Sequence, residues 1–158
     1  MKDYDYSIPG AYFVTITVNN REQLFGNISN ELFVLNWKSQ IVIESWKQLE
    51  INYPYVVLDE YCLMPDHFHG IIFILNKVQP STLTTVISVK ETIPKIKPLG
   101  QLIGAFKTIS TKQINISRNT PGETVWQRNY YDRVIRNETE LGHIRTYIME
   151  NPSRWSKE

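Results

Sequence analysis

The chain has 158 residues, of which 42% are apolar, 12% aromatic and 21% charged. This is the composition of one ordinary globular domain, so a wholly disordered or fibrous chain is excluded. The net charge is only +1, but residues 1–89 hold 5 basic against 9 acidic side chains, and residues 90–158 hold 12 against 7. The near-neutral total argues against a histone-like binder that relies on charge alone, while the basic second half is a mild indication of a polyanionic partner.

The cysteine content and the apolar runs indicate where the protein works. A single cysteine, Cys62, excludes an intrachain disulfide framework and is typical of a reducing cytosol. The first residues, Met1 to Tyr6, place no apolar stretch behind a basic start, so we expect no secretory signal. The longest membrane-like run, Gly70 to Leu75, is far shorter than the ~20 residues of a spanning helix. We therefore expect one soluble, cytoplasmic domain over residues 1–158, with no membrane partner.

The first half of the chain combines strand and helix patterns. Residues 12–18 alternate between apolar and partly polar positions, as in a strand with one buried face. Residues 31–51 carry apolar side chains spaced mostly by three, four or seven, which predicts an amphipathic helix. Residues 55–63 form a second predicted strand. After Pro65, residues 68–75 are apolar on both faces, as in a central strand.

The second half completes the predicted fold. Residues 76–98 hold three prolines and no clean period, which predicts a long mobile loop. A helix is predicted over 99–117, an extended segment over 125–136, and a last helix that Asn137 opens and Pro152 ends. The order strand, helix, strand, strand, helix, strand is a doubled split β-α-β unit. We therefore predict an α+β fold, a ferredoxin-like (RRM-like) sandwich with an antiparallel sheet of four to five strands, helices on one face and a C-terminal helix carrying a tyrosine.

Two of the three histidines, His67 and His69, form a His-Phe-His tripeptide at the start of the apolar strand. Residues i and i+2 of a strand point to the same face, so both imidazoles should project together while Phe68 faces the other layer. Two neutral imidazoles side by side can occupy two positions on one divalent metal. For an isolated tripeptide of this kind, two ordinary hydrogen-bonded polar side chains are the alternative.

The predicted last helix carries a second group of polar side chains. Its apolar stripe consists of Leu141, Ile144 and Ile148. His143, Tyr147 and Asn151 stand four apart and form a polar ridge on an adjoining face. The ridge places a potential ligand or proton carrier one turn away on each side of Tyr147. Packing against the core or its rim is the alternative for this tyrosine.

Three segments together resemble a known family. Residues 61–72 (YCLMPDHFHGII) are similar to the signature strand of the HUH transposases with one catalytic tyrosine, in which a hydrophobic residue separates two metal-binding histidines. Residues 126–136 (WQRNYYDRVIR) resemble the tryptophan-to-arginine segment of the REP-associated tyrosine transposases, and residues 145–152 (RTYIMENP) resemble their tyrosine helix. The resemblance covers roughly residues 10–155.

The resemblance implies a ferredoxin-like domain that cuts and rejoins single-stranded, hairpin-containing DNA with Mg²⁺ or Mn²⁺. By position, His67 and His69 are then metal ligands, and Tyr147 is the nucleophile that forms a 5′-phosphotyrosine. Asn151 stands where insertion-sequence members have a glutamine as third ligand, and an amide oxygen suits Mg²⁺. Because a phenol is a poor nucleophile at neutral pH, the metal would have to polarise the scissile phosphate. Insertion-sequence relatives are dimers that share active sites, so a homodimer stays open for this chain.

The extended segment 125–136 supplies the predicted DNA contacts. Its arginines would hold backbone phosphates, and its aromatic side chains would stack on unpaired bases. These predicted DNA-binding residues are Trp126, Arg128, Tyr130, Tyr131, Arg133 and Arg136. Packing of the aromatic side chains within the strand, with solvated arginines, is the alternative.

Two other functions fit parts of the sequence. A non-catalytic module that binds single-stranded nucleic acid shares this sandwich, but it needs neither the histidine pair nor Tyr147. Metal-dependent cleavage of a hairpin substrate would separate it from the transposase. A metal-dependent hydrolase would use the two histidines with zinc, but it needs a third strong ligand and a water-activating acid, for which Asp66 is the nearby candidate. Cleavage without a covalent DNA adduct would favour this hydrolase.

Overall fold

The computed structural model describes residues 9–30, 32–76 and 95–155, so most of the predicted loop over 76–98 lies outside the described residues. The main sheet has four antiparallel strands in the order β4-β5-β1-β6. These strands are β1 (Gly10–Thr17), β4 (Val56–Met64), β5 (His67–Ile74) and β6 (Tyr131–Ile135). Helix α1 (Trp37–Asn52) connects β1 to β4, and α2 (Leu99–Arg118) lies between β5 and β6. This arrangement confirms the predicted ferredoxin-like sandwich.

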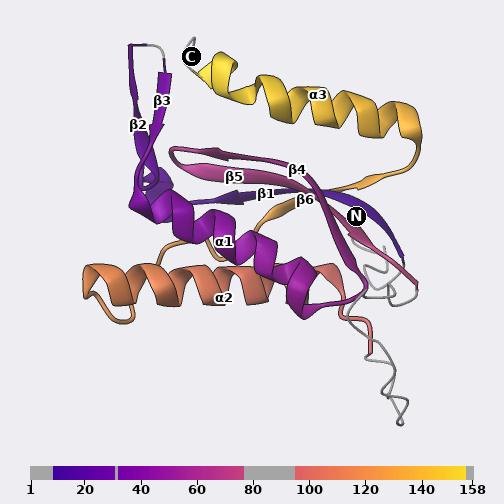
Figure 1. The fold of residues 1–158 in the computed structure, drawn as a ribbon, viewed down its shortest axis with the longest axis horizontal. Helices are drawn as coiled ribbons and strands as arrows, with labels where there is room; N and C mark the ends of the chain where they lie inside the picture. Colours follow the sequence, from indigo (N-terminus) through magenta and orange to yellow (C-terminus); the bar gives the residue numbers. More distant parts are fainter. Residues whose placement is uncertain (1–8, 31, 77–94, 156–158) are drawn as a thin grey trace.

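The helices form two layers on opposite faces of the sheet. Helices α1 and α2 lie side by side below the sheet in Figure 1, and the C-terminal helix α3 (Glu138–Trp155) lies above it. The predicted helices on one face are thus α1 and α2, while the helix that carries Tyr147 covers the other face. Each face of the sheet consequently has a hydrophobic core of its own.

Alternation along β1 divides its side chains between these two cores. Tyr12, Val14 and Ile16 are fully buried on the α1/α2 face, as the sequence pattern predicted. Phe13 belongs to the smaller core beneath α3, and Thr15 points to that same side because it contacts His69 there. The central strand β1 therefore places one set of side chains in the large core and the other set on the α3 face.

Aromatic side chains dominate the core on the α1/α2 face. The ring of Phe68 packs between Trp46 of α1 and Phe106 of α2, with centroid distances of 4.8 and 5.4 Å. Gly70 makes this close packing possible, since a Cβ at its position would lie 2.7 Å from Cζ2 of Trp46. A glycine in a central strand here marks close approach of another element rather than a turn.

A bulge in β4 decides which of its residues face α3. Leu58 pairs with Ile72 and Tyr61 with Gly70, so β4 holds one extra residue between the two pairs. Leu58 and Tyr61 both pack on the α1/α2 core although their numbers differ in parity. An extra residue reverses the alternation that follows it. Cys62 and Met64 therefore lie on the α3 face.

The prediction of a helix over residues 31–51 is wrong at its beginning. Residues Leu32–Leu35 form strand β3, which pairs with β2 (Gly26–Ser29) in a separate two-stranded sheet. Helix α1 begins only at Trp37, because Oδ1 of Asn36 accepts hydrogen bonds from the backbone N–H groups of Lys38 and Ser39. Residues 32–35 are all apolar, and a short continuous apolar run fits a strand as well as a helix, so the pattern alone could not exclude the hairpin.

The last helix begins as predicted but continues past the expected end. Oδ1 of Asn137 accepts from the N–H of Glu140, whose carboxylate accepts from the N–H of Arg136. The prediction that Pro152 ends the helix is wrong, since α3 extends to Trp155. Proline removes only its own N–H, and the loss of one hydrogen bond in the last turn of a helix costs less than in its interior.

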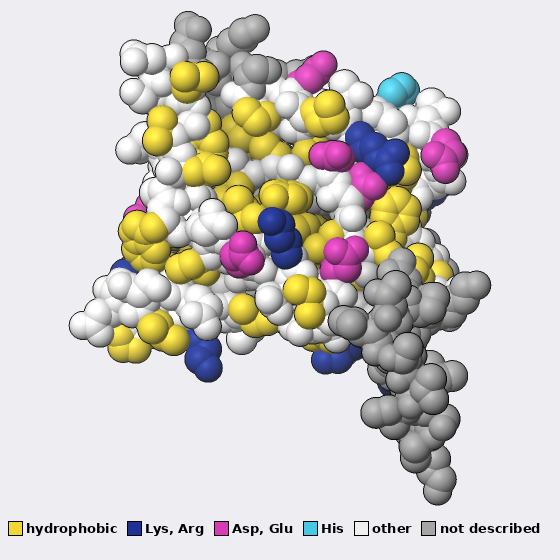
Figure 2. Space-filling model, in the orientation of Figure 1, with side chains coloured by type: hydrophobic (Ala, Val, Ile, Leu, Met, Phe, Trp, Pro, Cys, Tyr) yellow, Lys and Arg dark blue, Asp and Glu magenta, His cyan; other side chains and the backbone are white. Residues whose placement is uncertain are grey.

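The surface carries one concentration of apolar side chains away from both cores. It lies on the β2–β3 hairpin and the start of α1, towards the left of Figure 2. The exposed residues are Leu32, Val34, Leu35 and Trp37. None of the described helices combines the length and the apolar composition of a membrane-spanning segment.

Candidate active site

The two histidines lie together on the α3 face of β5, as the period of the strand predicted. The ring centroids of His67 and His69 are 4.6 Å apart, and the ring planes meet at 74°. Both residues are at most a tenth exposed. Phe68 between them is fully buried in the opposite core. The pair thus forms a polar site at the end of a strand that is otherwise apolar.

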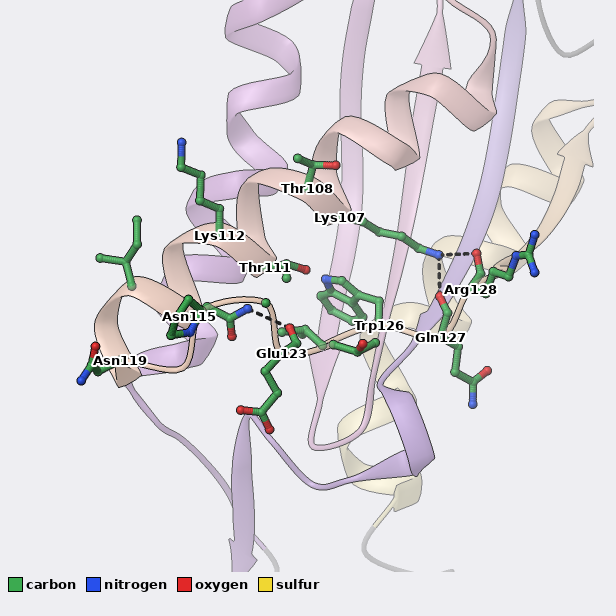
Figure 3. A pocket seen from close by; sticks show the side chains of 15 residues that line it. Lys107, Thr108, Thr111, Lys112, Asn115, Asn119, Glu123, Trp126, Gln127 and Arg128 are labelled. Carbon is green, nitrogen blue, oxygen red and sulfur yellow. Dashed lines mark hydrogen bonds between the residues drawn. The ribbon is translucent and has the colours of Figure 1, made fainter.

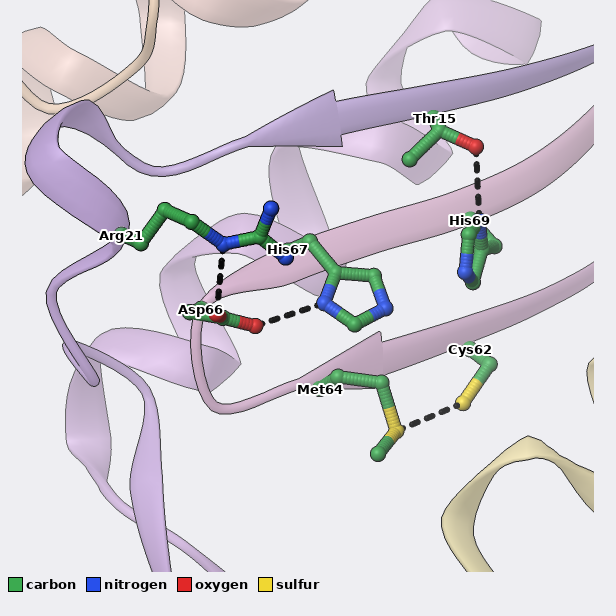
Figure 4. Close-up of polar contacts among 7 residues, drawn as sticks. All are labelled: Thr15, Arg21, Cys62, Met64, Asp66, His67 and His69. Carbon is green, nitrogen blue, oxygen red and sulfur yellow. Dashed lines mark hydrogen bonds and ion pairs between the residues drawn. The ribbon is translucent and has the colours of Figure 1, made fainter. Parts of the chain in front are cut away.

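Each imidazole is oriented by a hydrogen bond at Nδ1 (Figure 4). Nδ1 of His67 lies 2.6 Å from Oδ1 of Asp66, and a carboxylate only accepts, so this nitrogen carries the hydrogen. Nδ1 of His69 lies 2.8 Å from the hydroxyl of Thr15. When Nδ1 is occupied in this way, Nε2 is the nitrogen through which each ring would bind a metal.

Burial also sets the protonation state of the inner histidine. Desolvation, followed by the charge of the neighbouring His67, lowers the pKa of His69 from 6.5 to about 3. His69 is therefore neutral at physiological pH. A metal binds the neutral imidazole, so the electrostatics of the site agree with a ligand role.

Tyr147 of α3 lies against the inner histidine. Its ring centroid is 5.5 Å from that of His69 and 6.1 Å from that of Phe13. The residue is nevertheless 40% exposed. The contact therefore holds the ring at the site while leaving the side chain open to a large ligand.

An ion pair fixes the helix segment that presents Tyr147. The guanidinium of Arg145 donates from Nε and Nη2 to the two carboxylate oxygens of Asp59, at 2.8 and 2.7 Å. This bidentate bond joins α3 to β4 two residues before Tyr147. The hydrogen bonds hold the pKa of Asp59 below its ordinary value, since they favour the ionised carboxylate.

A cavity of about 400 Å³ opens beside this tyrosine. It brings Tyr147 and His69 together with Tyr131 and Arg133, two of the predicted DNA-binding residues. Arg133 is directed along the sheet by an ion pair of 2.9 Å with Glu140 at the start of α3. The lining residues are Phe13, Thr15, His69, Tyr131, Arg133, His143, Ile144 and Tyr147.

Asn151, the third predicted metal ligand, lies one turn after Tyr147 on α3 and is 8% exposed. In the part of the chain that the structure describes, no third histidine, cysteine, aspartate or glutamate joins the pair in a cluster that could hold a metal ion. A third protein ligand would therefore come from another residue type. The amide of Asn151 is the group that the sequence offers, and this role stays a prediction.

The remaining predicted DNA-binding residues lie away from this cavity. Trp126 is only 4% exposed; its ring packs on Phe25 and Phe106, and its Nε1 donates to the hydroxyl of Ser110. This burial favours the packing alternative over the base-stacking role that the sequence suggested. Trp126 lies before β6 and pairs with Val18 only through an isolated bridge. The alternation of side chains along β6 therefore does not apply to its ring.

The neighbours of Trp126 border a different cavity, of about 830 Å³, between the second half of α2 and residues 121–128 (Figure 3). Arg128 is exposed at its rim. Nζ of Lys107 donates to the backbone carbonyls of Gln127, Arg128 and Asn129 and so fixes this segment. Tyr130 is half-buried on the α2 side, where burial raises the pKa of its hydroxyl to about 12.

Sequence reasoning did not assign two residues that hold the site together. The sequence offers Asp66 only as a third ligand or water-activating acid of the hydrolase alternative, although its position directly before His67 is a usable signal for a hydrogen bond to that ring. Thr15 could not be found, because its contact depends on the pairing of Thr15 with His69 in the β1–β5 register. Arg136, the last predicted DNA-binding residue, is exposed just after β6.

Known proteins resemble this chain in sequence and in fold. No family model matches the chain. An uncharacterised protein of Haemophilus influenzae is 34% identical over 161 residues, covering 100% of this chain and 88% of that protein. A second H. influenzae protein, named "Putative REP-associated tyrosine transposase", is 23% identical over 149 residues, covering 94% of this chain and 73% of its own length. Among solved structures, a REP-associated tyrosine transposase bound to a REP hairpin matches the fold with a TM-score of 0.64 and 19% identity, over 98% of this chain and 74% of that one.

Proposed function

Because the chain belongs to one family with the uncharacterised H. influenzae protein and is a REP-associated tyrosine transposase-like protein, we propose that it cuts and rejoins single-stranded DNA through a covalent bond to Tyr147. The observation that carries the proposal is the contact between Tyr147 and His69, which come from α3 and β5. A structural tyrosine has no need of an oriented histidine pair beside it.

The donor set fits a divalent metal. His67 and His69 would bind it through Nε2, with Asp66 and Thr15 orienting the rings, and Asn151 would add an amide oxygen. Mg²⁺ or Mn²⁺ bound there would supply Lewis-acid polarisation of a phosphate oxygen. Two imidazoles also suit zinc, so cleavage has to be measured with each of these ions.

The covalent step follows from the chemistry of a phenol and a phosphodiester. The Oη of Tyr147 attacks phosphorus and forms a P–O bond, while the bond from phosphorus to the 3′-oxygen breaks. The phenolic proton leaves and the 3′-oxygen gains one, so the products are a 5′-phosphotyrosine and a free 3′-hydroxyl. One phosphodiester replaces another, so rejoining needs no external energy source.

The neighbouring cavity supports a single strand as substrate. Tyr131 is 60% exposed and Arg133 lies two residues along the same strand, so both point to the side of Tyr147. An exposed aromatic ring stacks only on a base that is not already stacked in a duplex, and the arginine can hold the adjoining phosphate. The structural relative is described as bound to a REP hairpin. We propose a hairpin with a single-stranded flank as the substrate here as well.

The proposal is tested by trapping the covalent adduct. The chain is incubated with Mn²⁺ and a hairpin oligonucleotide taken from DNA that flanks its gene, then denatured and analysed by mass spectrometry. We expect an adduct whose phosphate maps to Tyr147, and we expect none from Tyr147→Phe. Tyr53→Phe is the matched control, since it removes a phenolic hydroxyl on the α1/α2 side of the molecule and should leave the adduct unchanged.

The other outcomes decide between the alternatives. An adduct that maps to Tyr131, or that Tyr147→Phe still forms, contradicts the assignment of the nucleophile. Cleavage with no adduct indicates water activated by a metal, as in the hydrolase. Binding of the oligonucleotide without cleavage in Mg²⁺, Mn²⁺ or Zn²⁺ indicates the non-catalytic module.

A further inference from the structure

An arginine outside the predicted DNA-binding segment reaches the histidine pair from the end of β1. Arg21 closes the short 3-10 turn η1 (Asn19–Arg21), and its Nε donates to Oδ2 of Asp66 at 3.4 Å. The other oxygen of Asp66 accepts from His67. Figure 4 shows the guanidinium of Arg21 beside the ring of His67, with Asp66 bonded to both.

The two partners of this ion pair differ in exposure. The side chain of Asp66 is 7% exposed, whereas that of Arg21 is 67% exposed. Only Nε of the guanidinium is used, and in the described part of the chain Nη1 and Nη2 donate no hydrogen bond. Arg21 therefore presents two charged donors to solvent from a fixed position beside the histidines.

The backbone holds Arg21 in this position. The N–H of Arg21 donates to the carbonyl of Val18, whose own N–H donates to the carbonyl of Asp66, both at 2.9 Å. Asn20 and Arg21 adopt φ angles of 58° and 53°, a left-handed conformation that non-glycine residues rarely adopt. Such conformations persist only where surrounding contacts enforce them. The turn is thus tied directly to the β4–β5 connection that carries Asp66.

The chemistry of the exposed donors selects an anion. A guanidinium offers parallel N–H groups that match two oxygens of a phosphate. In Arg21, Nε already donates to Asp66, so Nη1 and Nη2 are the groups that can bind the phosphate. A positively charged side chain such as Arg21 is uncommon in this half of the sequence, because residues 1–89 hold only 5 basic side chains against 9 acidic ones. A positive charge beside the proposed metal site, in the acidic half of the chain, is better explained by binding of an anionic ligand than by a contribution to solubility.

We propose that Arg21 is a further DNA-binding residue of this site: Nη1 and Nη2 bind a backbone phosphate of the single strand while Nε remains on Asp66. This inference rests on the proposed function and extends its DNA contacts to the end of the site that is marked by His67. Arg133 and Tyr131 then hold the strand at the cavity beside Tyr147, so the strand passes across the histidine pair.

The test measures binding without chemistry. The affinity of the full chain for a fluorescent single-stranded oligonucleotide is measured in EDTA at several salt concentrations. We expect Arg21→Gln to bind about tenfold more weakly at low salt, and to reduce the slope of log affinity against log salt by about 0.7, as loss of one phosphate contact requires. Arg21→Lys should keep most of the slope while recovering only part of the affinity, because it retains the charge but not the fork.

Lys47→Gln is the control, since it removes one exposed positive charge from α1 on the opposite side of the sheet and should leave the slope unchanged. Equal slopes for Arg21→Gln and the parent overturn the inference while leaving the proposed function intact. A lower Mn²⁺ affinity of Arg21→Gln with an unchanged slope also overturns it, because Arg21 would then act only by positioning Asp66. A parent chain that binds no single-stranded DNA overturns the proposed function together with this inference.

Discussion

The two faces of the sheet are filled in different ways. On the α1/α2 face, large aromatic side chains such as Trp46, Phe68 and Phe106 are fully buried. On the α3 face, a smaller cluster that includes Phe13 and Met64 gives way to the histidine pair and the cavity beside Tyr147. The same strands β1 and β5 contribute to both faces through their alternating side chains.

This difference separates stability from chemistry within one sheet. Polar groups in a core are costly unless each is hydrogen-bonded, so the buried imidazoles depend on Asp66 and Thr15, which bind their Nδ1 atoms. Substitutions on the α3 face should therefore reduce activity, and substitutions on the α1/α2 face should reduce stability.

The largest effect should come from a substitution in the histidine pair on the α3 face. His69→Ala removes a proposed metal ligand, so we expect the rate of DNA cleavage to fall by more than about 100-fold, the upper range for loss of a residue that only supports a ligand. The far-ultraviolet circular dichroism spectrum should stay that of the parent, because the aromatic core is untouched. Cleavage is measured as an initial rate with Mn²⁺.

His143→Ala serves as the control for this prediction. His143 lines the same cavity from the exposed side of α3 but lies outside the pair on β5. The variant should retain most of the cleavage rate. A parent-like rate in His69→Ala would remove the metal site from this face, and an equal loss in both variants would show that the cavity as a whole, rather than the pair, is required.

The opposite face should respond in stability. Phe68→Ala leaves a cavity between Trp46 and Phe106, and we expect the free energy of unfolding to fall by about 3–5 kcal/mol. Phe13→Ala on the α3 face should cost less, because Phe13 is 8% exposed and borders an existing cavity. Urea unfolding of both variants measures the difference. An equal or larger loss from Phe13→Ala would contradict the view that the aromatic face dominates stability.

The sequence predicted those parts of the site that depend on strand or helix periodicity. The period of two placed His67 and His69 together and Phe68 in the opposite core. Spacing along the last helix correctly gave the buried stripe of Leu141, Ile144 and Ile148. These predictions succeeded because each rests on the geometry of one element.

The remaining features depend on pairing between elements that are distant in sequence. Thr15 reaches His69 through the β1–β5 register, and Arg21 reaches Asp66 through the turn that follows β1. The bulge in β4 reverses the facing of Cys62 with no marker in the sequence. Trp126 resembled a base-stacking residue in composition, but it lies outside β6, so no alternation could indicate that its ring enters the core.

The smallest effect should come from the contact that joins α3 to the sheet. Hydrogen bonds from Arg145 lower the pKa of Asp59 below 3.8, so the folded state binds its proton less readily than the unfolded state. The stabilisation is therefore complete above the unfolded pKa and is lost as pH falls through the lower folded pKa. Because Arg145 is partly exposed, we expect a contribution of about 1 kcal/mol at most. Asp59→Asn should lower the free energy of unfolding by this amount at pH 7 and by progressively less below pH 3.8, with urea unfolding measured at each pH.

If the difference between variant and parent stayed constant down to the lowest pH, the loss would come from packing rather than from the ionised carboxylate. A cleavage rate that falls at pH 7 while the protein remains folded would show that this ion pair also positions Tyr147, two residues further along α3.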